Sequence, residues 1–402
     1  MDEDLAKVVG HRVRFYRTAV RQTRTVTAGL TGVTPDYLYQ IERGQKLPTI
    51  TVLAKLAEVL RVPLAELFPP HPTPRPPRQA CAAGDAIYHA LTNPRTEIKV
   101  ATSPADLRRD VVSAWEIWQT SPYRYSLLTN RLPLLVERAE AALRASATHD
   151  EKGRRALYGS AADLYCLLRT VTKRTGRNDV SLLVADRAVR AAEAADQPLR
   201  IAVARWNLTQ VLLADGQAEG AESVAMHAAD DLLPLLAADN LDAVALRGSL
   251  LLIATIAAAR QGQGWIARDR LKDVVPLAAL TGERNTGWTA FGPTNVAMYA
   301  VSIEMETGEA VEGLRLAPHV DHLTSPSIER RVAFLLDQAR GYQQRRDYSS
   351  AFLLLTTARR EAPEDIEHRP AAHTILRAII EHGRRPIATE AARLAIRIGL
   401  PL

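Results

Sequence analysis

Cysteine, secretory signals and membrane-spanning segments are scarce or absent in this chain of 402 residues. Its two cysteines, Cys81 and Cys166, are far apart in the sequence and do not form the disulfide framework of a small secreted protein. The N-terminal stretch MDEDLAKVV is acidic and lacks the apolar core of a signal peptide. The longest apolar run, Leu250 to Ala259, is too short to cross a bilayer. We therefore expect a reduced, cytoplasmic protein with no membrane partner.

Catalytic and metal-binding signatures are also missing. The chain has no GxSxG, HExxH or P-loop motif. The stretch GQGWIA, residues 262–267, loosely matches a dinucleotide-binding GxGxxA pattern, but no strand precedes it. His319, Asp321 and His322 are too few for a metal site, so we interpret them as part of a solvated loop. We interpret the thiol of Cys166 as a core group. We expect no cofactor, no metal and no enzymatic activity.

Aromatic residues make up only 5% of the chain, whereas Ala, Leu and Arg are abundant. These three residue types lose little conformational entropy in a helix, so the composition favours an all-α fold. The proportions of charged (24%) and apolar (47%) residues are those of folded domains, and the length suffices for two or three of them. The formal net charge is +6, and residues 1–70 hold ten Lys and Arg against seven Asp and Glu. This short segment therefore carries about half of the excess positive charge.

A proline-rich stretch, PPHPTPRPPRQ, separates two regions of different character. Proline has no amide donor and favours extended backbone in the residue before it, so this stretch cannot be helical. We predict a DNA-binding domain over residues 1–68, a semi-rigid linker over residues 69–80, and a helical repeat domain over residues 81–402. The spacing of apolar residues in the first domain predicts five short helices.

The segment GVTPDYLYQIERG, residues 32–44, is the most specific motif in the chain. Gly32 provides a turn, and Thr34 followed by Pro35 suits the start of a helix. That helix has apolar residues on one side and polar residues on the other. A glycine turn followed by such an amphipathic helix predicts a helix-turn-helix, whose second helix enters the major groove of DNA.

Polar residues near the start of this reading helix are positioned for contacts with duplex DNA. Gln40 can pair with adenine through two hydrogen bonds, and Asp36 can accept one from the amino group of cytosine. Cations and hydroxyl groups around the helix are placed for phosphates. The predicted DNA-binding residues are Arg24, Thr34, Pro35, Asp36, Tyr37, Tyr39, Gln40, Arg43 and Lys46. The alternative is a helix-turn-helix that contacts only protein.

Residues 5–68 resemble the helix-turn-helix domain of the Xre/Cro repressor family, most closely in the stretches YLYQIERGQKLPT and LAKLAEVLRVPLAELF. In that family an arginine of the first helix pairs with the glutamate of the IERG-type motif. The resemblance therefore implies a buried ion pair between Arg17 and Glu42. Thr27 and Thr31 stand where the family usually carries leucines, so we expect a less stable second helix.

The rest of the chain shows a weak internal repeat of helical pairs. One segment follows the tetratricopeptide pattern of small, aromatic and large residues ending in proline: Ala339, Tyr342, Tyr348, Ala351, Leu355, Ala358 and Pro363. Gly216, Gly262 and Gly308 mark fainter copies, and the faintest lies near Ala185. We predict degenerate tetratricopeptide-like repeats, with a generic helical bundle as the alternative.

In tetratricopeptide stacks the first helix of each pair lines a concave groove. Asn, Gln and Arg side chains in such a groove can bind a peptide backbone or a carboxylate. The repeat register and one glycine-flanked aromatic segment predict this lining: Trp206, Gln210, Ser249, Arg260, Trp288, Phe291, Asn295, Ser302, Arg340 and Gln343. The alternative for Trp288 and Phe291 is that they plug a kinked joint between repeats. A second aromatic cluster is interpreted as core packing or a dimer contact: Trp115, Trp118, Tyr123 and Tyr125.

The combination of the two domains resembles regulators of actinobacterial type and, in architecture, the peptide-sensing Rgg/PlcR group. The stretches WEIWQTSPYRYS, AADLYCLLR and GPTNVAMYAVSIEMETGEA resemble the C-terminal half of the actinobacterial regulators. The resemblance implies a homodimeric transcription factor that binds double-stranded DNA and senses a peptide or small-molecule effector. The alternative is a repeat-based interaction adaptor that its N-terminal domain tethers to DNA.

Overall fold

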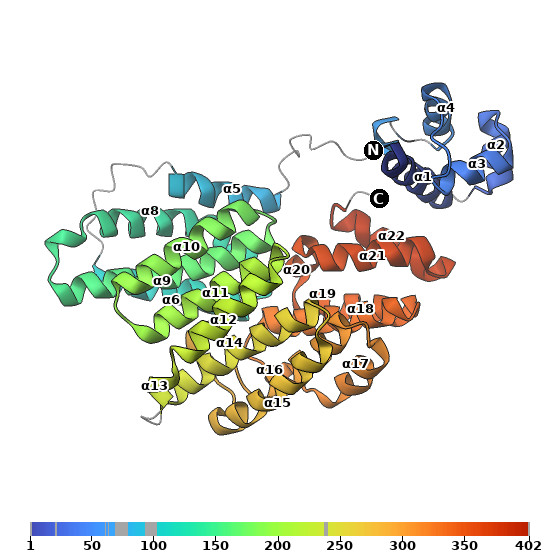
Figure 1. Cartoon of the computed structure of the whole chain (residues 1–402). Coiled ribbons are helices and arrows are strands. Elements are labelled where there is room, and N and C mark those ends of the chain that lie inside the picture. The colour runs from blue at the N-terminus through green and yellow to red at the C-terminus, as the bar shows by residue number, and fades with distance from the viewer. Residues whose placement is uncertain are drawn as a thin grey trace. The chain divides into compact units, whose positions relative to one another are not determined.

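The computed structural model of the chain describes residues 2–20, 22–60, 62, 64–68, 79–92, 103–236 and 240–400. The regular elements in these ranges are helices, and an isolated antiparallel bridge joins Arg284 to Phe291. The chain divides into two compact units, Met1–Pro76 and Pro77–Leu402 (Figure 1). The predicted all-α class is confirmed. Most of the predicted linker over residues 69–80 lies outside the described residues, and the next helix begins at Gln79.

The N-terminal unit holds the five short segments that the apolar spacing predicts, the last of them as a 3-10 turn. They are α1 (Asp2–Ala19), α2 (Arg24–Thr31), α3 (Pro35–Glu42), α4 (Ile50–Leu60) and η1 (Leu64–Leu67). Their apolar faces meet in one small core, to which α3 contributes Leu38 and Ile41. Burial of one face of α3 leaves its opposite face at the surface.

Two glycines let α1 pass close to the end of α3. A Cβ atom on Gly10 would lie 2.0 Å from the carbonyl oxygen of Ile41. A Cβ atom on Gly44, whose φ is +69°, would lie 2.7 Å from the Cα atom of Lys7. Both collisions are with backbone, so neither position accepts a side chain without a shift of the helices. This close approach fixes the orientation of α3 within the unit.

The C-terminal unit opens with α5 (Gln79–Thr92), α6 (Pro104–Thr120), α7 (Arg124–Thr129), α8 (Arg131–Arg144) and the 3-10 turn η2 (Ser146–Thr148). Antiparallel helical hairpins follow (Figure 1). They are α9 (Glu151–Arg174) with α10 (Asn178–Ala194), α11 (Pro198–Ala214) with α12 (Ala218–Asp230), α14 (Leu241–Arg260) with α15 (Gly264–Thr281), α16 (Pro293–Glu306) with α17 (Ala310–Leu316), α18 (Ile328–Gln344) with α19 (Tyr348–Glu361), and α21 (Pro370–His382) with α22 (Arg385–Arg397). Shorter connecting elements are α13 (Leu233–Leu236), η3 (Thr286–Trp288), η4 (Ala317–His319), η5 (His322–Thr324) and α20 (Pro363–His368).

Most of these hairpins share one turn. A glycine with φ between +77° and +85° follows the first helix of four pairs: Gly176, Gly216, Gly262 and Gly308. Arg346 takes the same place after α18, with φ +61°. A left-handed residue just beyond a helix end is a common stop signal, and glycine adopts it without steric cost. The glycines that mark the repeats in the sequence are therefore the turns of the hairpins.

α14 is apolar and long enough to cross a membrane by composition, but its apolar window is 83% buried inside the unit. It packs against α12, α15 and α16. Its composition is therefore that of a core helix in a stack of hairpins.

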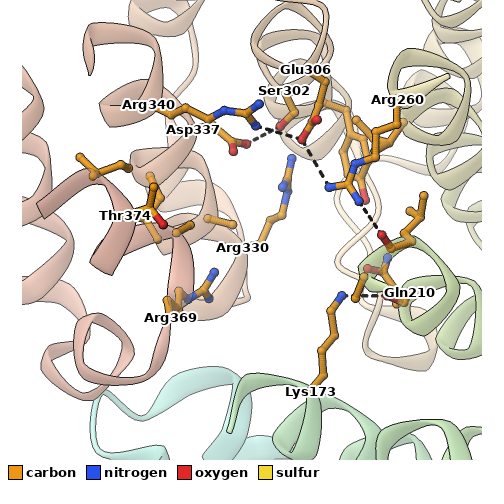
Figure 2. Close-up of a pocket in the computed structure, with 18 of the residues that line it drawn as sticks. Lys173, Gln210, Arg260, Ser302, Glu306, Arg330, Asp337, Arg340, Arg369 and Thr374 are labelled. Carbon is orange, nitrogen blue, oxygen red and sulfur yellow. Dashed lines mark hydrogen bonds and ion pairs between the residues drawn. The ribbon is translucent and has the colours of Figure 1, made fainter. Parts of the chain in front are cut away.

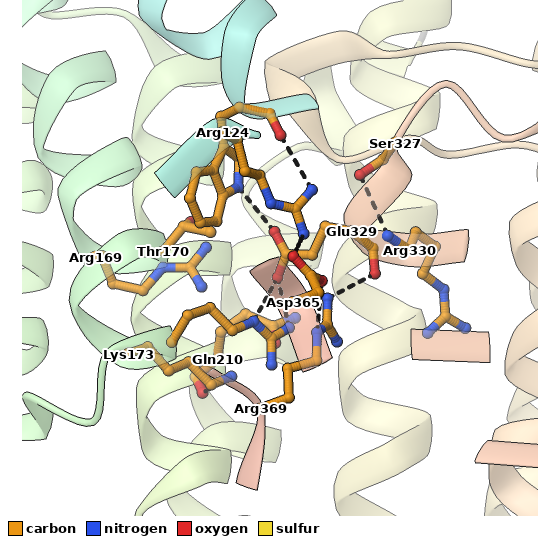
Figure 3. Close-up of polar contacts among 12 residues, drawn as sticks. Arg124, Arg169, Thr170, Lys173, Gln210, Ser327, Glu329, Arg330, Asp365 and Arg369 are labelled. Carbon is orange, nitrogen blue, oxygen red and sulfur yellow. Dashed lines mark hydrogen bonds and ion pairs between the residues drawn. The ribbon is translucent and has the colours of Figure 1, made fainter. Parts of the chain in front are cut away.

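Charged groups join the last hairpins to the first helices of the unit (Figure 3). The carboxylate of Glu329 on α18 accepts hydrogen bonds from Nε1 of Trp118 (2.9 Å) and from Nε of Arg174 (2.8 Å). Asp365 on α20 pairs with Arg124 of α7 and, through a 2.8 Å contact, with Arg369. Segments separated by more than 200 residues are thus held together by buried charges.

The second aromatic cluster belongs to the core for the most part. Trp115, Trp118 and Tyr125 are buried, and the rings of Trp118 and Tyr125 meet edge to face. Tyr123 is the exception, with 58% of its surface exposed. Cys166 is buried as predicted.

Candidate nucleic-acid interface and effector cavity

The turn between α2 and α3 is defined by caps that the sequence supplies. Gly32 ends α2 in the left-handed conformation, with φ +72°. Thr34 caps α3, because its Oγ1 atom accepts a hydrogen bond from the backbone N–H of Tyr37 (3.1 Å), and Pro35 occupies the first helical turn. This is the predicted start of the reading helix.

A buried ion pair anchors the C-terminal end of α3. Glu42 accepts hydrogen bonds from Nε (2.5 Å) and Nη2 (3.1 Å) of Arg17 on α1. The Glu42 side chain is only 1% exposed. The structure thus contains the pair that the resemblance to the Xre/Cro family implies, and the bidentate geometry sets the roll of α3 against α1.

Arg24, which the sequence predicts to contact a phosphate, also makes contacts within the protein. Its Nε atom donates to the second carboxylate oxygen of Glu42 (2.8 Å), and its guanidinium lies 5.0 Å from the centre of the Tyr39 ring. Its side chain is still 42% exposed. Arg24 therefore helps to neutralise Glu42 and to position Tyr39, and only its outer edge faces solvent.

The solvent-facing side of α3 carries a preformed polar pair. The Nε2 atom of Gln40 donates a hydrogen bond to Oδ2 of Asp36, one helical turn earlier (2.9 Å). An amide group has two N–H donors and a carbonyl acceptor, so Gln40 keeps one donor and its acceptor for another partner. The contact restricts the Gln40 side chain before any ligand arrives.

Two exposed cations follow the C-terminal end of α3. Arg43 is exposed just past α3 and lies 5.9 Å from the Tyr39 ring centre, and exposed Lys46 lies 5.8 Å from that of the half-buried Tyr37. The N-terminal end of a helix adds partial positive charge from its free amide groups. The surface formed by α3 and the residues after it therefore carries positive charge at both ends of the helix.

Thr27 and Thr31, which stand where the Xre/Cro family usually carries leucines, are buried in α2 with their hydroxyl groups bonded. Thr27 donates to the side-chain oxygen of Gln22, and Thr31 donates to the backbone oxygen of Thr27, both over 2.8 Å. Burial of a hydroxyl costs little when its hydrogen bond is made.

The N-terminal unit matches known proteins. A sequence model described as a helix-turn-helix domain matches residues 8–67. The uncharacterized HTH-type transcriptional regulator YazB of Bacillus subtilis (strain 168) is 34% identical over 65 residues, which are 16% of this chain and 94% of that protein. The chain belongs to the HTH-type transcriptional regulators. This confirms the predicted helix-turn-helix, while the narrower assignment to the Xre/Cro family stays a prediction.

Solved structures resemble the regulator only distantly. PlcR of Bacillus thuringiensis, in a complex with the peptide PapR7 and DNA, has 12% identity and a TM-score of 0.31, covering 68% of this chain and 95% of that one. The apo form of the competence regulator ComR from Streptococcus vestibularis has 11% identity and a TM-score of 0.27, covering 98% of this chain and 99% of that one.

The C-terminal unit of the regulator contains a cavity of about 740 Å³ (Figure 2). Its lining comes from α9, α11, α14, α16 and α18, the first helices of successive hairpins, and from α21 with the residue before it. Five residues of the predicted groove lie in it: Gln210, Arg260, Ser302, Arg340 and Gln343. The volume is in the range of sites that bind small molecules or short peptides.

A smaller cavity of about 120 Å³ adjoins the first, because both share Gln210, Tyr299 and Arg330. Trp206, Trp288 and Asn295 of the predicted groove line it. Trp288 also stacks on Trp115, with ring centres 5.4 Å apart and planes within 5°. Trp288 is therefore both a cavity wall and a packing contact.

Two residues of the predicted groove are in the core instead. Phe291 is fully buried and packs so closely on α14 that a Cβ atom on Gly248 would lie 2.1 Å from its ring. The hydroxyl of Ser249 bonds to Ala245 O (2.9 Å) and to Oγ1 of Thr289 (3.0 Å). Neither residue is in the lining of the two cavities, in contrast to the predicted groove, because both face the joint between α14 and the loop before α16. Phe291 fills that joint, as the alternative interpretation states.

The repeat register explains which lining residues sequence reasoning found and which it missed. Positions six and two residues before the left-handed turn residue point into the cavities in successive hairpins: Thr170 and Arg174, Gln210 and Ala214, Ile256 and Arg260, Ser302 and Glu306, Arg340 and Gln344. The sequence reasoning followed this register only from α11 onward. It missed α9, whose repeat signal is faint, and with it Lys173 and Arg174.

Carboxylates of the cavity are already engaged with neighbours (Figure 2). Glu306 lies between Arg260 (3.3 Å) and Arg340 (3.2 Å). Asp337 accepts a hydrogen bond from the hydroxyl of Ser302 (2.6 Å), and burial raises the pKa of Asp337 above its ordinary value. In the part of the chain that the structure describes, no group of three or more His, Cys, Asp or Glu side chains is arranged to hold a metal ion. His322 instead contacts Glu361 (2.9 Å).

Proposed function

We propose that the regulator reads duplex DNA through α3, with Gln40 as the base-contacting group and Arg43 and Lys46 as phosphate contacts. The observation that supports this most is the Asp36–Gln40 hydrogen bond on the exposed face of a helix whose other end is locked by Glu42. A restrained amide loses less side-chain entropy when it pairs with a base.

Binding of the full chain to a selected operator and to unrelated DNA tests the proposal. Arg43→Ala should weaken binding to both DNAs alike, because phosphates are the same in every sequence. Gln40→Ala should reduce the preference for the operator by about tenfold, the effect of one base contact of about 1–3 kcal/mol. Arg190→Gln, a change at a 76% exposed side chain on α10, is the control. Undiminished affinity and preference in both variants would contradict the assignment of α3.

We further propose that the regulator acts as a homodimer in the cytoplasm, at the nucleoid, without catalysis. Two reading helices would bind half-sites about 34–36 Å apart, one turn of DNA. The steepness of the salt dependence separates this from the adaptor alternative. A tether would bind with a steep salt slope and little sequence preference, whereas a regulator retains a large ratio of specific to non-specific affinity.

We also propose that the 740 Å³ cavity binds the effector. The support is that first helices from five successive hairpins converge on it, so a ligand there contacts most of the stack. Such a ligand changes DNA affinity only to the extent that it binds the two states of the protein unequally. PlcR has been solved with a peptide and DNA, which makes a peptide one candidate effector.

A further inference from the structure

The effector cavity has an excess of positive charge. Of its described lining residues, six are basic and two are acidic. The basic ones are Lys173, Arg174, Arg260, Arg330, Arg340 and Arg369, and the acidic ones are Glu306 and Asp337. A buried excess of this size is unfavourable unless another anion balances it.

Four of the six cations have carboxylate partners within the protein. Arg260 and Arg340 share Glu306. Nη2 of Arg174 lies 2.5 Å from Oε1 of Glu329, and Nε of Arg369 lies 2.8 Å from Oδ2 of Asp365. These four guanidinium groups therefore already have ion-pair partners.

Lys173 and Arg330 differ from the others. Among the described residues, neither has a carboxylate within ion-pair distance. Lys173 Nζ donates to the backbone oxygen of Gln210 (2.9 Å), which carries no full charge. Arg330 Nε donates to the neutral side-chain oxygen of Asn295 (2.7 Å), and its Nη2 atom is buried without any acceptor. A buried guanidinium nitrogen without an acceptor is unfavourable, so an acceptor bound beside it would stabilise the protein.

The surroundings of Lys173 agree with this. Burial lowers the pKa of Lys173 well below its ordinary value of 10.5, and the positive charges of Arg174 and Arg169 add to the effect. An anion bound beside this amine would favour its protonated form. Arg330 reaches the same cavity from α18 and lies over the Tyr299 ring at 4.3 Å (Figure 2).

Part of the cavity wall is apolar. Leu213, Ile253 and Ile256 contribute from α11 and α14, and Leu336 and Ile375 contribute from α18 and α21. A ligand that contacts both the cations and this wall therefore combines an anionic group with an apolar body.

We propose that the cavity is a binding site for an organic anion, whose carboxylate or phosphate head is held by Lys173 and Arg330 while its apolar body lies on the Ile253–Ile256 wall. This names the ligand class of the effector cavity and rests on the function proposed for it. A carboxylate and a phosphate can be recognised in the same way, because each accepts charge-assisted hydrogen bonds from the two cations, which come from separate helices. Ligand binding then links α9 to α18. The Arg174–Glu329 ion pair, whose partners are 155 positions apart in the sequence, already joins these two helices.

Isothermal titration calorimetry of the full chain tests the site with three probes of equal chain length: octanoate, octyl phosphate and the neutral octanamide. The titrations use tris buffer, because sulfonate and phosphate buffers are themselves anions. At least one anion should bind about tenfold or more tightly than octanamide, the effect of a charged hydrogen bond. The stronger of the two anions identifies the preferred head group. Equal affinities for all three probes, or no binding by either anion at millimolar concentration, would overturn the proposal.

Variants distinguish the contribution of the two cations to binding from that of the apolar wall. Lys173→Met and Arg330→Gln should each weaken the anion about tenfold and leave octanamide within about twofold. Arg330→Lys should restore part of the anion affinity, which a purely structural role would not require. Arg190→Gln on α10 is the matched control, because it removes an arginine charge at an exposed position. Equal losses for anion and amide in both variants would show that they only damage the cavity.

The failure of this proposal can be distinguished from failure of the proposed function. Operator affinity is measured with and without the better anion. Anion binding that depends on Lys173 and Arg330 but leaves DNA affinity unchanged supports the site and contradicts the effector role. Normal DNA reading by α3 with no anion binding contradicts the site alone.

Discussion

At the scale of single residues, buried charges give the clearest tests of the structure. The first is the Arg17–Glu42 ion pair. We predict that Glu42→Gln destabilises the N-terminal unit by about 3–5 kcal/mol, because the buried Arg17 guanidinium loses its counter-ion. Exchange of backbone amide hydrogens in α1 and α3, measured by mass spectrometry on the full chain, should become faster by orders of magnitude. Exchange in α14 should not change. Unaltered protection of α3 would mean that the pair does not hold this helix.

The second informative charge is Lys173, whose lowered pKa gives anion binding a pH dependence. An anion favours the protonated amine and so raises its pKa in the complex. Affinity should be constant while Lys173 is protonated without ligand, and should fall as pH rises through the lowered pKa toward 10.5.

The measurement is the octanoate affinity between about pH 6 and pH 10, a range in which an ordinary carboxylate is already ionised. Lys173→Met, which cannot titrate at this position, should give a flatter and weaker profile. A wild-type profile as flat as that of the variant would remove Lys173 from the site.

At the scale of single residues, a contact can be predicted from the sequence where a known motif contains it. Arg17 and Glu42 follow from the resemblance of YLYQIERG to a family in which the pair occurs. Ser249 was assigned to the groove and is in the core, because helical periodicity gives a face only to within about one residue and α14 is apolar on nearly all sides. Arg330 was not predicted, since nothing in its local sequence shows that its Nη2 atom lacks an acceptor.

Elements are specified mainly by their ends. The turns after α9, α11, α14 and α16 use glycine, while Arg346 adopts φ +61° in the turn after α18. A residue with a Cβ atom pays roughly 1–2 kcal/mol in this conformation, and glycine does not.

We predict that Arg346→Gly stabilises the C-terminal unit by about 0.5–1 kcal/mol, the difference between relieved strain and lost chain entropy. The converse change, Gly216→Ala, should destabilise it by about 1–2 kcal/mol. A Cβ atom there meets nothing within 4 Å, so no collision adds to the backbone strain. Urea unfolding of both variants provides the two values. Changes of the same sign would contradict the equivalence of the turns.

The same local signals explain why the elements could be predicted. Caps and turn glycines are encoded within a few residues, as Thr34–Pro35 and Gly216 show. The faint copy near Ala185 lies in α10, whereas the cavity is lined by α9, the first helix of that hairpin.

At the scale of the whole C-terminal unit, buried charges close the stack of hairpins (Figure 3). Burial alone would raise the pKa of Glu329, but the guanidiniums of Arg174, Arg369 and Arg124 outweigh burial and hold it well below its ordinary value of 4.5. A carboxyl group with a lowered pKa in the folded state stabilises the fold above its unfolded pKa, and this contribution is lost as pH falls below it.

We therefore predict that the melting temperature of the C-terminal unit falls steeply below about pH 4.5. Glu329→Gln should melt lower than wild type at pH 7, because Arg174 then lacks its partner, and should show a weaker dependence on acid. Differential scanning calorimetry of both proteins across this range gives the comparison. Parallel curves would show that Glu329 does not carry the effect. This closure was not predicted, since no local pattern links residues as distant as Arg124 and Asp365.

The central claim is that α3 reads base pairs, and selection of bound sequences from a random DNA pool tests it most directly. The full chain and its Gln40→Ala variant are carried through the same selection. We predict that wild type enriches paired half-sites about one helical turn apart, and that the variant loses preference at one base pair of each half-site and keeps the others. Identical motifs from both proteins, or no motif from wild type, would contradict the claim.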